Sequence, residues 1–479
     1  MSKFIGRGKE LEKLNHLLAR RSASLIIVKG RRRVGKSRLL EEFGKNFPVV
    51  YTFSGLPPSK EQNEITAQAE RDEFARQFAK QAKNKNCEKD DWGNLFWSVA
   101  ELCKQGRVLI ILDEISWMGS KDLNFLGKLK IAWDLYFKKN DELILAICGS
   151  ASAWIDKNIL SSTGFFGRES LNLTLEELPI SECIKFWGQE QERYSAYEKL
   201  KILSVTGGIP RYLEQLDIKL PAEQNIHELC FDKTGILFDE FEKIFSDLFY
   251  PKNLLYKNVV NCLSDGAATQ SIVCQKLGLK LSSVIAECLD DLIKSGFVSR
   301  DYTWHIENSK VSKLSQYRLK DNYSRFYLKY ILPNREKIES GGMQEISLAN
   351  FPGWHSILGL QIENLILSNR NIIKDALKIN LNDIVCDNPF FQRKTNKVEG
   401  CQIDYMIQTK YNVLYLCEIK YSKNEVGVIA IDEMREKIRR LKIPKYFSYR
   451  TVLIHVNGVS EALEDTQYFT HIIDLKNYL

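Results

Sequence analysis

Residues 30–37 read Gly30-Arg31-Arg32-Arg33-Val34-Gly35-Lys36-Ser37 and fit the pattern G-x-x-x-x-G-K-[ST] without a mismatch. An apolar run precedes this stretch at residues 25–28, and residues 39–43 follow it, which predicts a buried strand and then a helix. Glycines let the backbone of such a loop curl so that its N–H groups point at phosphates, while the lysine reaches the β- and γ-phosphates and the hydroxyl holds Mg²⁺. We therefore predict a nucleoside triphosphate site formed by this loop and the adjoining Arg38.

A second apolar run, residues 108–112, ends in the two carboxylates Asp113 and Glu114. In P-loop enzymes an acid at such a strand end holds Mg²⁺, so Asp113 is predicted to share the metal with Ser37. Glu114 is the natural general base for an attacking water. The apolar run 143–148 places Ser150 at the carboxyl edge of the sheet, where open α/β sheets bind ligands. Ser150 either senses the γ-phosphate or is an ordinary turn serine.

Composition and length limit the class of protein. At ~100–200 residues per domain, 479 residues predict about three domains. No apolar run approaches the ~20 residues that span a bilayer, and the first residues lack the apolar core of a signal peptide, so we expect a cytoplasmic protein with no membrane partner. The eleven cysteines contain no C-x-x-C pair and are expected to be reduced thiols. A net charge of +7 permits nucleic-acid binding without requiring it.

The first half of the chain alternates strands and helices, which is typical of a parallel sheet with helices on both faces. Residues 60–105 are polar and helix-forming and are predicted to be an insertion between the second and third strands. Beyond residue 175 the strands stop, and helices near 180–188 and 196–205 are expected to form a lid. We predict an ATPase core over 1–175 and a helical lid over 176–250, with core strands near 24–29, 48–53, 107–112, 143–148 and 170–174.

Residues 251–335 resemble a winged helix-turn-helix. Helices are predicted at 254–263 and 269–277, with Thr269 as the N-cap of the second, followed by a third helix and a hairpin over 296–319. In DNA-binding modules of this kind the third helix enters the major groove. Here its exposed face carries acids that phosphates would repel, namely Glu287, Asp290 and Asp291. DNA contact and a purely structural or protein-docking role both remain open.

A polar stretch at 333–342 is predicted to be a linker to the last domain, residues 351–479. The strand 402–407 carries Asp404, and the next strand, paired with it across a turn, carries Glu418 and Lys420 on one face. Burying charges on such a face is costly unless they are paired or bound to a metal.

These residues suit metal-assisted phosphodiester hydrolysis. Asp404 and Glu418 would bind Mg²⁺ through oxygen, and Lys420 would orient the attacking water. Glu363, on a helix predicted at 357–368, would hold metal-bound water. The alternative interpretation is a pair of edge-strand acids beside a solvated lysine.

Together these motifs resemble the prokaryotic family called archaeal-type ATPases, whose members couple an AAA-like P-loop domain to a winged helix and a restriction-endonuclease-like domain of the PD-(D/E)xK type. Residues 4–11 look like the F-x-G-R-x-x-E-L box of such ATPases. Residues 165–168 resemble the family's G-R element, which makes Arg168 a candidate for contacting the γ-phosphate in cis or across a subunit boundary. Residues 207–213 match the G-G-x-P-x-Y-L lid motif, with Arg211 as a second candidate sensor.

The resemblance also carries the family's metal-site acids onto Asp404 and Glu418, its lysine onto Lys420 and its helix acid onto Glu363. One departure is visible, because Gln402-Ile403-Asp404 stands where the nominal P-D pair of the nuclease motif belongs. The arginines at 31–33 make the P-loop unusually basic. We expect them to face solvent, with contact to phosphate or nucleic acid as the alternative.

The predicted fold is α/β: a P-loop NTPase parallel sheet with a helical lid, a winged helix-turn-helix and a C-terminal nuclease-like domain. The leading hypothesis is an ATP- and Mg²⁺-dependent ATPase that controls a DNA-directed C-terminal domain, in a chain that can form homo-oligomers. The alternative hypothesis is a signalling switch whose nuclease-like domain is inactive and docks DNA or protein. A loader resembling replication initiators ranks third, because the C-terminal acids have no purpose in it.

Overall fold

The chain divides into two compact units. The computed structural model describes residues 4–57, 66–83, 87–119, 121–249, 252–343, 346–396 and 398–479. Unit 1 comprises Met1–Leu178, Glu242–Asn253 and Lys294–Gly296, and unit 2 comprises Pro179–Phe241, Leu254–Ile293 and Phe297–Leu479. The predicted domain boundaries are finer than this division and stay predictions. Part of the predicted insertion, residues 60–65 and 84–86, lies outside the described residues.

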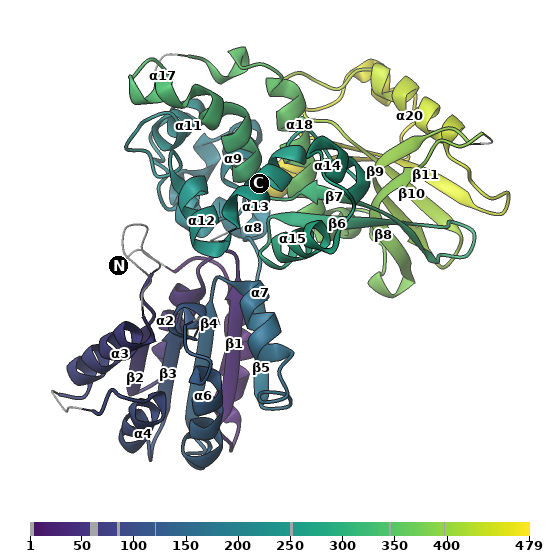
Figure 1. The fold of residues 1–479 in the computed structure, drawn as a ribbon. Coiled ribbons are helices and arrows are strands. Elements are labelled where there is room, and N and C mark those ends of the chain that lie inside the picture. The colour runs from purple at the N-terminus through teal and green to yellow at the C-terminus, as the bar shows by residue number, and fades with distance from the viewer. Residues whose placement is uncertain are drawn as a thin grey trace. The chain divides into compact units, whose positions relative to one another are not determined.

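Unit 1 contains a five-stranded sheet in the order β2-β3-β4-β1-β5, in which all neighbours are parallel (Figure 1). The predicted strands are therefore confirmed. Parallel strands end at the same edge of a sheet, so the loops that follow β1, β3 and β4 lie at one edge. The strands are β1 (Ser24–Gly30), β2 (Val49–Ser54), β3 (Val108–Asp113), β4 (Leu143–Gly149) and β5 (Glu169–Leu175).

Helices pack on this sheet through apolar side chains. An aromatic cluster covers one face, where Phe74 stacks on Phe53 at 4.1 Å between ring centroids and Trp92 meets Phe125 edge-on at 4.7 Å. Such pairs contribute about 0.5–1.5 kcal/mol beyond their buried area. The helices are α1 (Gly8–Asn15), α2 (Lys36–Gly44), α3 (Ala67–Gln81), α4 (Trp92–Leu102), α5 (Ile115–Gly119), α6 (Phe125–Leu135) and α7 (Ser152–Ile155).

Unit 2 begins with helices. The helix expected at 180–188 is instead a short helix, α8 (Ile180–Cys183), followed by a 3₁₀ segment with a kink at Gly188, whose φ of 56° suits a glycine. The helix expected at 196–205 is confirmed as α9 (Ala196–Thr206), which Ser195 caps through a bond from the N–H of Glu198. The other helices of this region are α10 (Pro210–Leu213), α11 (Ala222–Cys230) and α12 (Glu240–Phe249), the last of which spans the boundary of the two units.

Three helices and a hairpin follow: α13 (Asn253–Cys262), α14 (Gln270–Lys276), α15 (Ser283–Lys294), β6 (Val298–Trp304) and β7 (Val311–Leu319). Thr269 caps α14 as predicted, because its hydroxyl accepts the N–H of Ile272 at 3.4 Å. The acids Glu287 and Asp290 on α15 are exposed. The elements thus lie where the sequence places them, and their identity as a winged helix stays a prediction.

The rest of unit 2 is a mixed sheet in the order β12-β11-β10-β9-β8, with helices beside it. β9 and β10 are antiparallel neighbours, as predicted, whereas β10, β11 and β12 are parallel. The predicted linker contains a short helix, α17 (Arg335–Glu339). The strands are β8 (Ile384–Gln392), β9 (Cys401–Thr409), β10 (Val413–Ile419), β11 (Ser448–His455) and β12 (His471–Asp474), and the helices are α16 (Asn322–Phe326), α18 (Trp354–Ser368), α19 (Arg370–Ala376), α20 (Ile429–Arg440) and α21 (Glu461–Glu464).

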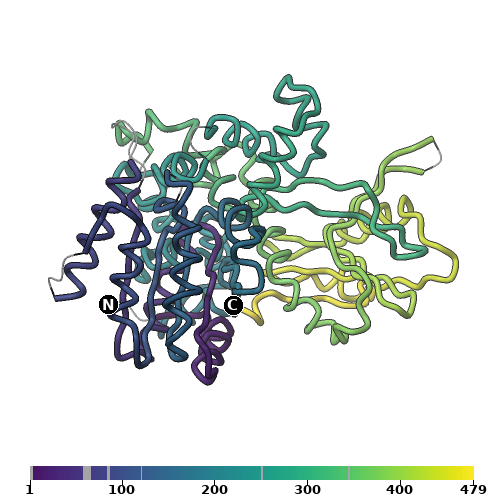
Figure 2. The backbone as a smooth tube through the Cα atoms, turned by 60° about the horizontal axis from the view of Figure 1, so that its bottom comes forward, coloured from purple at the N-terminus to yellow at the C-terminus, as the bar shows by residue number. Residues whose placement is uncertain are grey.

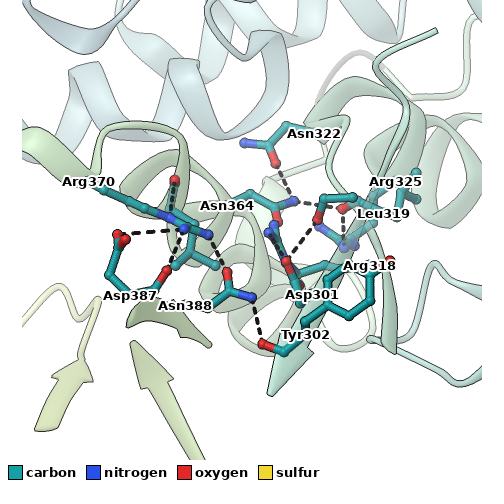
Figure 3. A network of polar contacts seen from close by, with 12 residues as sticks. Asp301, Tyr302, Arg318, Leu319, Asn322, Arg325, Asn364, Arg370, Asp387 and Asn388 are labelled. Carbon is teal, nitrogen blue, oxygen red and sulfur yellow. Dashed lines mark hydrogen bonds and ion pairs between the residues drawn. The ribbon is translucent and has the colours of Figure 1, made fainter. Parts of the chain in front are cut away.

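A buried polar network joins the hairpin to α18 (Figure 3). Arg318 pairs with Asp301 across the hairpin at 2.7 Å and also donates to the side-chain oxygen of Asn364 on α18. Arg325 is fully buried and donates to Gln361 Oε1 at 2.7 Å and to the Leu319 carbonyl at 2.8 Å. Because buried charges are costly unless they are satisfied, these contacts fix the hairpin against α18.

Candidate functional site

The P-loop connects β1 to α2, and glycine is required at both of its ends. Gly30 has a φ of 147°, and a Cβ there would lie 2.3 Å from the carbonyl oxygen of Leu175. Gly35 precedes α2 with a φ of 92°, in the left-handed region that favours glycine. The backbone therefore curls between a buried strand and a helix start, as the motif predicts.

Lys36 is buried at the base of this loop. Its Nζ donates to the carbonyls of Gly30 and Arg31, each at 3.0 Å, and to Ser150 Oγ at 2.9 Å. Burial lowers the pKa of Lys36, and the nearby Cys148, Glu114 and Asp113 counteract this. All three acceptors are neutral oxygens, so the positive charge remains available to an anion.

Ser37 and Asp113 lie in contact at the same edge. Ser37 Oγ donates to Asp113 Oδ2 at 2.7 Å, while Asp113 Oδ1 accepts from the Cys148 thiol at 2.9 Å and from the N–H of Glu114 at 3.0 Å. Burial raises the pKa of Cys148 well above its usual value, so the sulfur stays a thiol and a donor. A hydroxyl and a carboxylate side by side are oxygen ligands of the kind that Mg²⁺ prefers, so this pair fits the predicted metal.

Glu114 is held by Ser150, the residue that follows the neighbouring strand β4. Ser150 donates its backbone N–H to Glu114 Oε2 at 3.0 Å and its hydroxyl to Oε1 at 2.8 Å. Glu114 has a φ of 50°, in the left-handed region that few non-glycine residues adopt. Since Ser150 also accepts from Lys36, it bridges the predicted phosphate-binding lysine and the predicted general base.

The arginines of the loop do not simply face solvent, which corrects that prediction. Arg31 is only 4% exposed, and its guanidinium lies 3.7 Å from Glu177 Oε1. Arg32 pairs with Asp247 and lies over the ring of Trp117. Acids that are distant in the sequence hold both side chains within unit 1, which the local pattern could not indicate.

Arg168 lies at the opposite edge of the sheet from the P-loop. It precedes β5, whose first residue pairs with Leu25 at the start of β1, whereas Leu175 at the end of β5 pairs with Gly30. At ~3.3 Å per residue, these two edges are about 20 Å apart. Arg168 instead forms two hydrogen bonds to Asp134, at 3.0 and 3.1 Å, and holds the pKa of that carboxyl well below its usual value. The expectation of contact in cis is therefore wrong, and contact across a subunit boundary stays a prediction.

Arg7, from the box at residues 4–11, connects three parts of unit 1. It is buried and donates to the carbonyl of Val34 in the P-loop at 2.9 Å and to the carbonyl of Glu176 after β5. The structure thereby gives this box a role in supporting the phosphate loop. Arg38, one turn into α2, lies 3.8 Å from Glu41.

The C-terminal acids meet a lysine that the sequence analysis missed. Lys437, on α20, lies 3.1 Å from Asp404 Oδ1 and also pairs with Glu418 Oε2. Lys420 contacts the other oxygen of Glu418 at 3.0 Å and pairs with Glu433 of α20. The predicted sharing of one side by Glu418 and Lys420 is confirmed.

We call Asp404, Glu418, Lys420 and Lys437 the closed cluster, because their opposite charges pair with one another. Burial raises the pKa of Glu418, as does Asp404, while Lys437 opposes the shift. Burial would lower the pKa of Lys437, but Asp404 and Glu418 raise it above its usual value. A buried ion pair of this kind is held by its hydrogen bonds, and removing one partner would leave an uncompensated charge.

The predicted metal ligands Glu363, Asp404 and Glu418 do not form a group that could bind one metal ion. Across the residues that the structure describes, no three or more His, Cys, Asp or Glu side chains are grouped so that they could hold a metal ion. The physical reason is that the ammonium of Lys437 pairs with both strand acids. Glu363, on α18, is near enough for its charge to interact with Asp404, and burial together with that charge raises its pKa to about 7.

A pattern on α20 could have revealed Lys437. The buried residues Ala430, Ile431 and Met434 define the apolar face of this helix. A residue three positions after Met434 lies on that same face, so the helical spacing predicts that the side chain of Lys437 points toward the sheet.

Comparisons with known proteins agree with this geometry. Residues 4–216 match the family model described as an ATPase domain predominantly from Archaea. An uncharacterized protein of Methanocaldococcus jannaschii is 27% identical over 344 residues, which are 71% of each chain. A Walker-type ATPase of Pyrococcus abyssi aligns with a TM-score of 0.50 at 16% identity, over 68% of this chain and 96% of that one, and shows a shared fold. The family model thus supports an ATPase domain over residues 4–216.

In the part of the chain that the structure describes, no helix combines the length and the apolar character needed to cross a membrane.

Proposed function

We propose that this chain is a Mg²⁺-dependent ATPase whose site is the P-loop edge of unit 1. The observation that carries the proposal is the hydrogen-bonded series Lys36, Ser150 and Glu114, beside the contacting pair Ser37 and Asp113. An ammonium, a hydroxyl in contact with a carboxylate, and a second carboxylate therefore lie at the end of one parallel sheet. That is the set of groups that phosphoryl transfer to water needs.

Each group has a role in the proposed reaction. The loop amides and Lys36 bind the phosphate tail, and Ser37 and Asp113 would hold the metal, which neutralises charge on the phosphates. Glu114 accepts a proton from the attacking water as the new oxygen–phosphorus bond forms and the bond to the bridging oxygen of ADP breaks. Ser150 orients that carboxylate through its N–H and hydroxyl.

Replacing Lys36 tests this proposal. In Lys36→Ala we expect ATP turnover to fall by about 10²–10³-fold, as when one donor to a developing charge is removed. The matched control is Lys9→Ala, which changes an exposed lysine of α1 in the same unit. Unchanged turnover in Lys36→Ala, measured as phosphate release with Mg²⁺ present, would refute the assignment.

The position of Arg168 favours an assembly. Because the sheet separates Arg168 from its own P-loop, we propose that it reaches the γ-phosphate of a neighbouring copy. Mass measurement of the full chain with and without an ATP analogue should show a nucleotide-dependent oligomer. Turnover of Arg168→Ala should fall without loss of ATP binding, whereas Lys130→Ala, which also removes a cation from Asp134, should leave turnover unchanged. Full turnover by a monomer would contradict this part.

For unit 2 we propose a DNA-directed module with a nuclease-like but silent C-terminal domain. What supports silence is that Lys437 pairs with both Asp404 and Glu418, and Lys420 pairs with the other oxygen of Glu418. Plasmid incubated with the protein, ATP and either Mg²⁺ or Mn²⁺ should remain intact. Cleavage that is lost in Asp404→Ala and kept in the exposed control Lys423→Ala would instead establish a nuclease.

A further inference from the structure

Two adjoining hollows run along the hairpin of unit 2 and the end of β8. The larger has a volume of about 640 Å³ and lies between the hairpin, β8 and the loop that follows α20. The smaller, about 340 Å³, lies between the hairpin and the start of α14. Leu314 and Arg393 line both, so the hollows form one groove, called here the hairpin groove. β6 and β8 lie side by side in both views (Figure 1, Figure 2).

The charges of the hairpin groove are strongly one-sided. Five cationic side chains line it against one carboxylate, that of Glu307; the cations are Arg300, Lys313, Arg393, Lys442 and Lys445. Among the described residues, none of these five lies within ion-pair distance of an acid, although most other cations around the C-terminal sheet are paired. An unpaired cationic row in a concave surface concentrates positive potential and attracts a polyanion.

Aromatic rings accompany the cations. Tyr446 is 57% exposed beside Lys445 and lines the larger hollow. At the smaller hollow the guanidinium of Arg300 lies between two tyrosines, 4.8 Å from the ring of Tyr302 and 5.3 Å from that of Tyr317. Exposed rings and stacked guanidinium planes are surfaces on which unpaired bases stack.

The walls of the groove are fixed by buried contacts. Trp304 Nε1 donates to Gln408 Oε1 at 2.6 Å, and Gln408 Nε2 donates to the carbonyl of Ile306 at 2.9 Å. Asn388 on β8 donates to the carbonyl of Tyr302 at 2.9 Å (Figure 3). The hairpin is therefore attached to the C-terminal sheet, and the cations stand on a preformed surface rather than on a free loop.

We propose that the hairpin groove binds the phosphodiester backbone of a single strand of nucleic acid. The inference deepens the DNA-directed role proposed for unit 2 and rests on it, but it does not depend on ATP hydrolysis. A hollow of about 640 Å³ can hold one backbone, whereas a duplex, whose major groove alone is about 12 Å wide, does not enter it. The exposed acids Glu287 and Asp290 of α15 oppose the usual helix-in-groove contact with a duplex on that face, because phosphates repel them.

The groove leads toward the acidic cluster. Gln392, which lines the groove, pairs with Cys401 on β9, and Asp404 lies three residues further along that strand. At ~3.4 Å per residue this is about 10 Å. The end of the groove at Gln392 therefore lies on the order of 10 Å from the backbone of Asp404.

The test measures binding by the full chain. Labelled oligothymidylate of about 20 nucleotides, longer than the ~4–16 that one single-strand module covers, is titrated at about 50 mM salt and followed by fluorescence anisotropy. Parallel titrations use an RNA of equal length and a duplex. The variant is Arg393→Glu combined with Lys445→Glu, and the matched control is Lys233→Glu, which changes an exposed lysine outside the groove.

We expect the double variant to weaken single-strand binding at least tenfold and to reduce its salt dependence, while Lys233→Glu binds as the unaltered protein does. ATP turnover should be equal in all three proteins, which separates a failure of the groove from a failure of the ATPase proposal. Equal binding by the double variant and the control would overturn the groove, and so would no binding of any nucleic acid by the unaltered protein. Tighter binding of duplex than of single strand, lost in the same variant, would overturn the single-strand assignment.

Discussion

Lys36, which is buried, and Lys437, which is partly buried, both lie near pairs of carboxylates, and they differ in what they donate to. Lys36 donates to two backbone carbonyls and a serine hydroxyl, while Asp113 and Glu114 are held by other donors. Lys437 pairs directly with Asp404 and Glu418. The pKa of Lys36 is lowered, mainly by burial, whereas the pKa of Lys437 is raised despite burial because two carboxylates contact it.

This difference in hydrogen-bond partners distinguishes the two sites. At the P-loop site, called the open site, the lysine is not paired with a carboxylate, whereas in the closed cluster the carboxylates are already paired with lysines. At the P-loop, the cation and the acids are kept apart, so an incoming triphosphate meets positive charge and an incoming metal meets an acid and a hydroxyl. In the C-terminal cluster, a metal would have to displace an ammonium from both acids. Displacement costs the ion pairs that now stabilise the sheet, so the cluster favours structure over metal binding.

The largest expected effect comes from removing the lysine of the closed cluster. Lys437→Met keeps much of the side-chain volume but leaves Asp404 and Glu418 without their shared cation. We expect the free energy of unfolding to fall by about 3–5 kcal/mol in urea titrations with a chelator present. Millimolar Mg²⁺ should recover part of the loss, because the acids then accept a metal in the lysine's place.

Arg439→Met is the matched control for that experiment. Arg439 lies on the same helix but pairs with Glu399 and Glu436 at the exposed surface. Its loss should cost less than about 1 kcal/mol, as is usual for exposed ion pairs. If Lys437→Met were no more damaging than Arg439→Met, the closed cluster would not be a stabilising device and the comparison with Lys36 would fail.

The next effect concerns the base of the open site. Glu114→Gln can keep one of the two hydrogen bonds that Ser150 donates but cannot accept a proton, so we expect ATP turnover to fall by about 10²-fold while ATP affinity stays within a few-fold. Equilibrium binding of a fluorescent ATP analogue and phosphate release measure the two quantities. Glu176→Gln, a change at the end of β5, serves as the control. A parallel loss of binding and turnover would indicate that Glu114 supports the loop rather than the water.

The open site could be predicted from the sequence more fully than the closed one. The P-loop is local: a buried strand, two glycines at fixed spacing and a helix start specify its geometry, and the acids of β3 follow from another strand end. Arg168 shows where motif matching stops. β5 runs parallel to β1, so the start of β5 lies at the edge of the sheet away from the loop, which the motif containing Arg168 does not indicate. The burial of Arg31 likewise depends on its ion pair with Glu177, which follows β5, the last strand of this sheet along the chain.

The C-terminal cluster depends even more on tertiary packing. Asp404, Glu418 and Lys420 were found because they lie on adjacent strands, and alternation along a strand is visible in the sequence. Lys437 enters from a helix that packs across those strands, and the pairing of its charge with both acids is a property of the folded unit. Glu363 was placed on the correct helix, but its relation to the acids depends on how α18 meets the sheet.

The smallest expected effect concerns Glu363 on α18, whose raised pKa reports the electrostatic field of the closed cluster. Burial and the charge of Asp404 raise its pKa from 4.5 to about 7, although Arg318 and Arg325 oppose the shift. Between these two pH values the folded chain binds a proton that the unfolded chain has released, so Glu363 makes stability fall as pH rises from about 4.5 to 7. Glu363→Gln should remove that part of the pH dependence, so its free energy of unfolding should rise relative to that of the unaltered protein by at most about 3 kcal/mol between pH 4 and pH 8. Urea titrations across this range test it, with the exposed Glu425→Gln as the control, which should follow the unaltered protein at every pH. A difference between Glu363→Gln and the unaltered protein that does not change with pH would mean that neither burial nor the charge of Asp404 raises the pKa of Glu363.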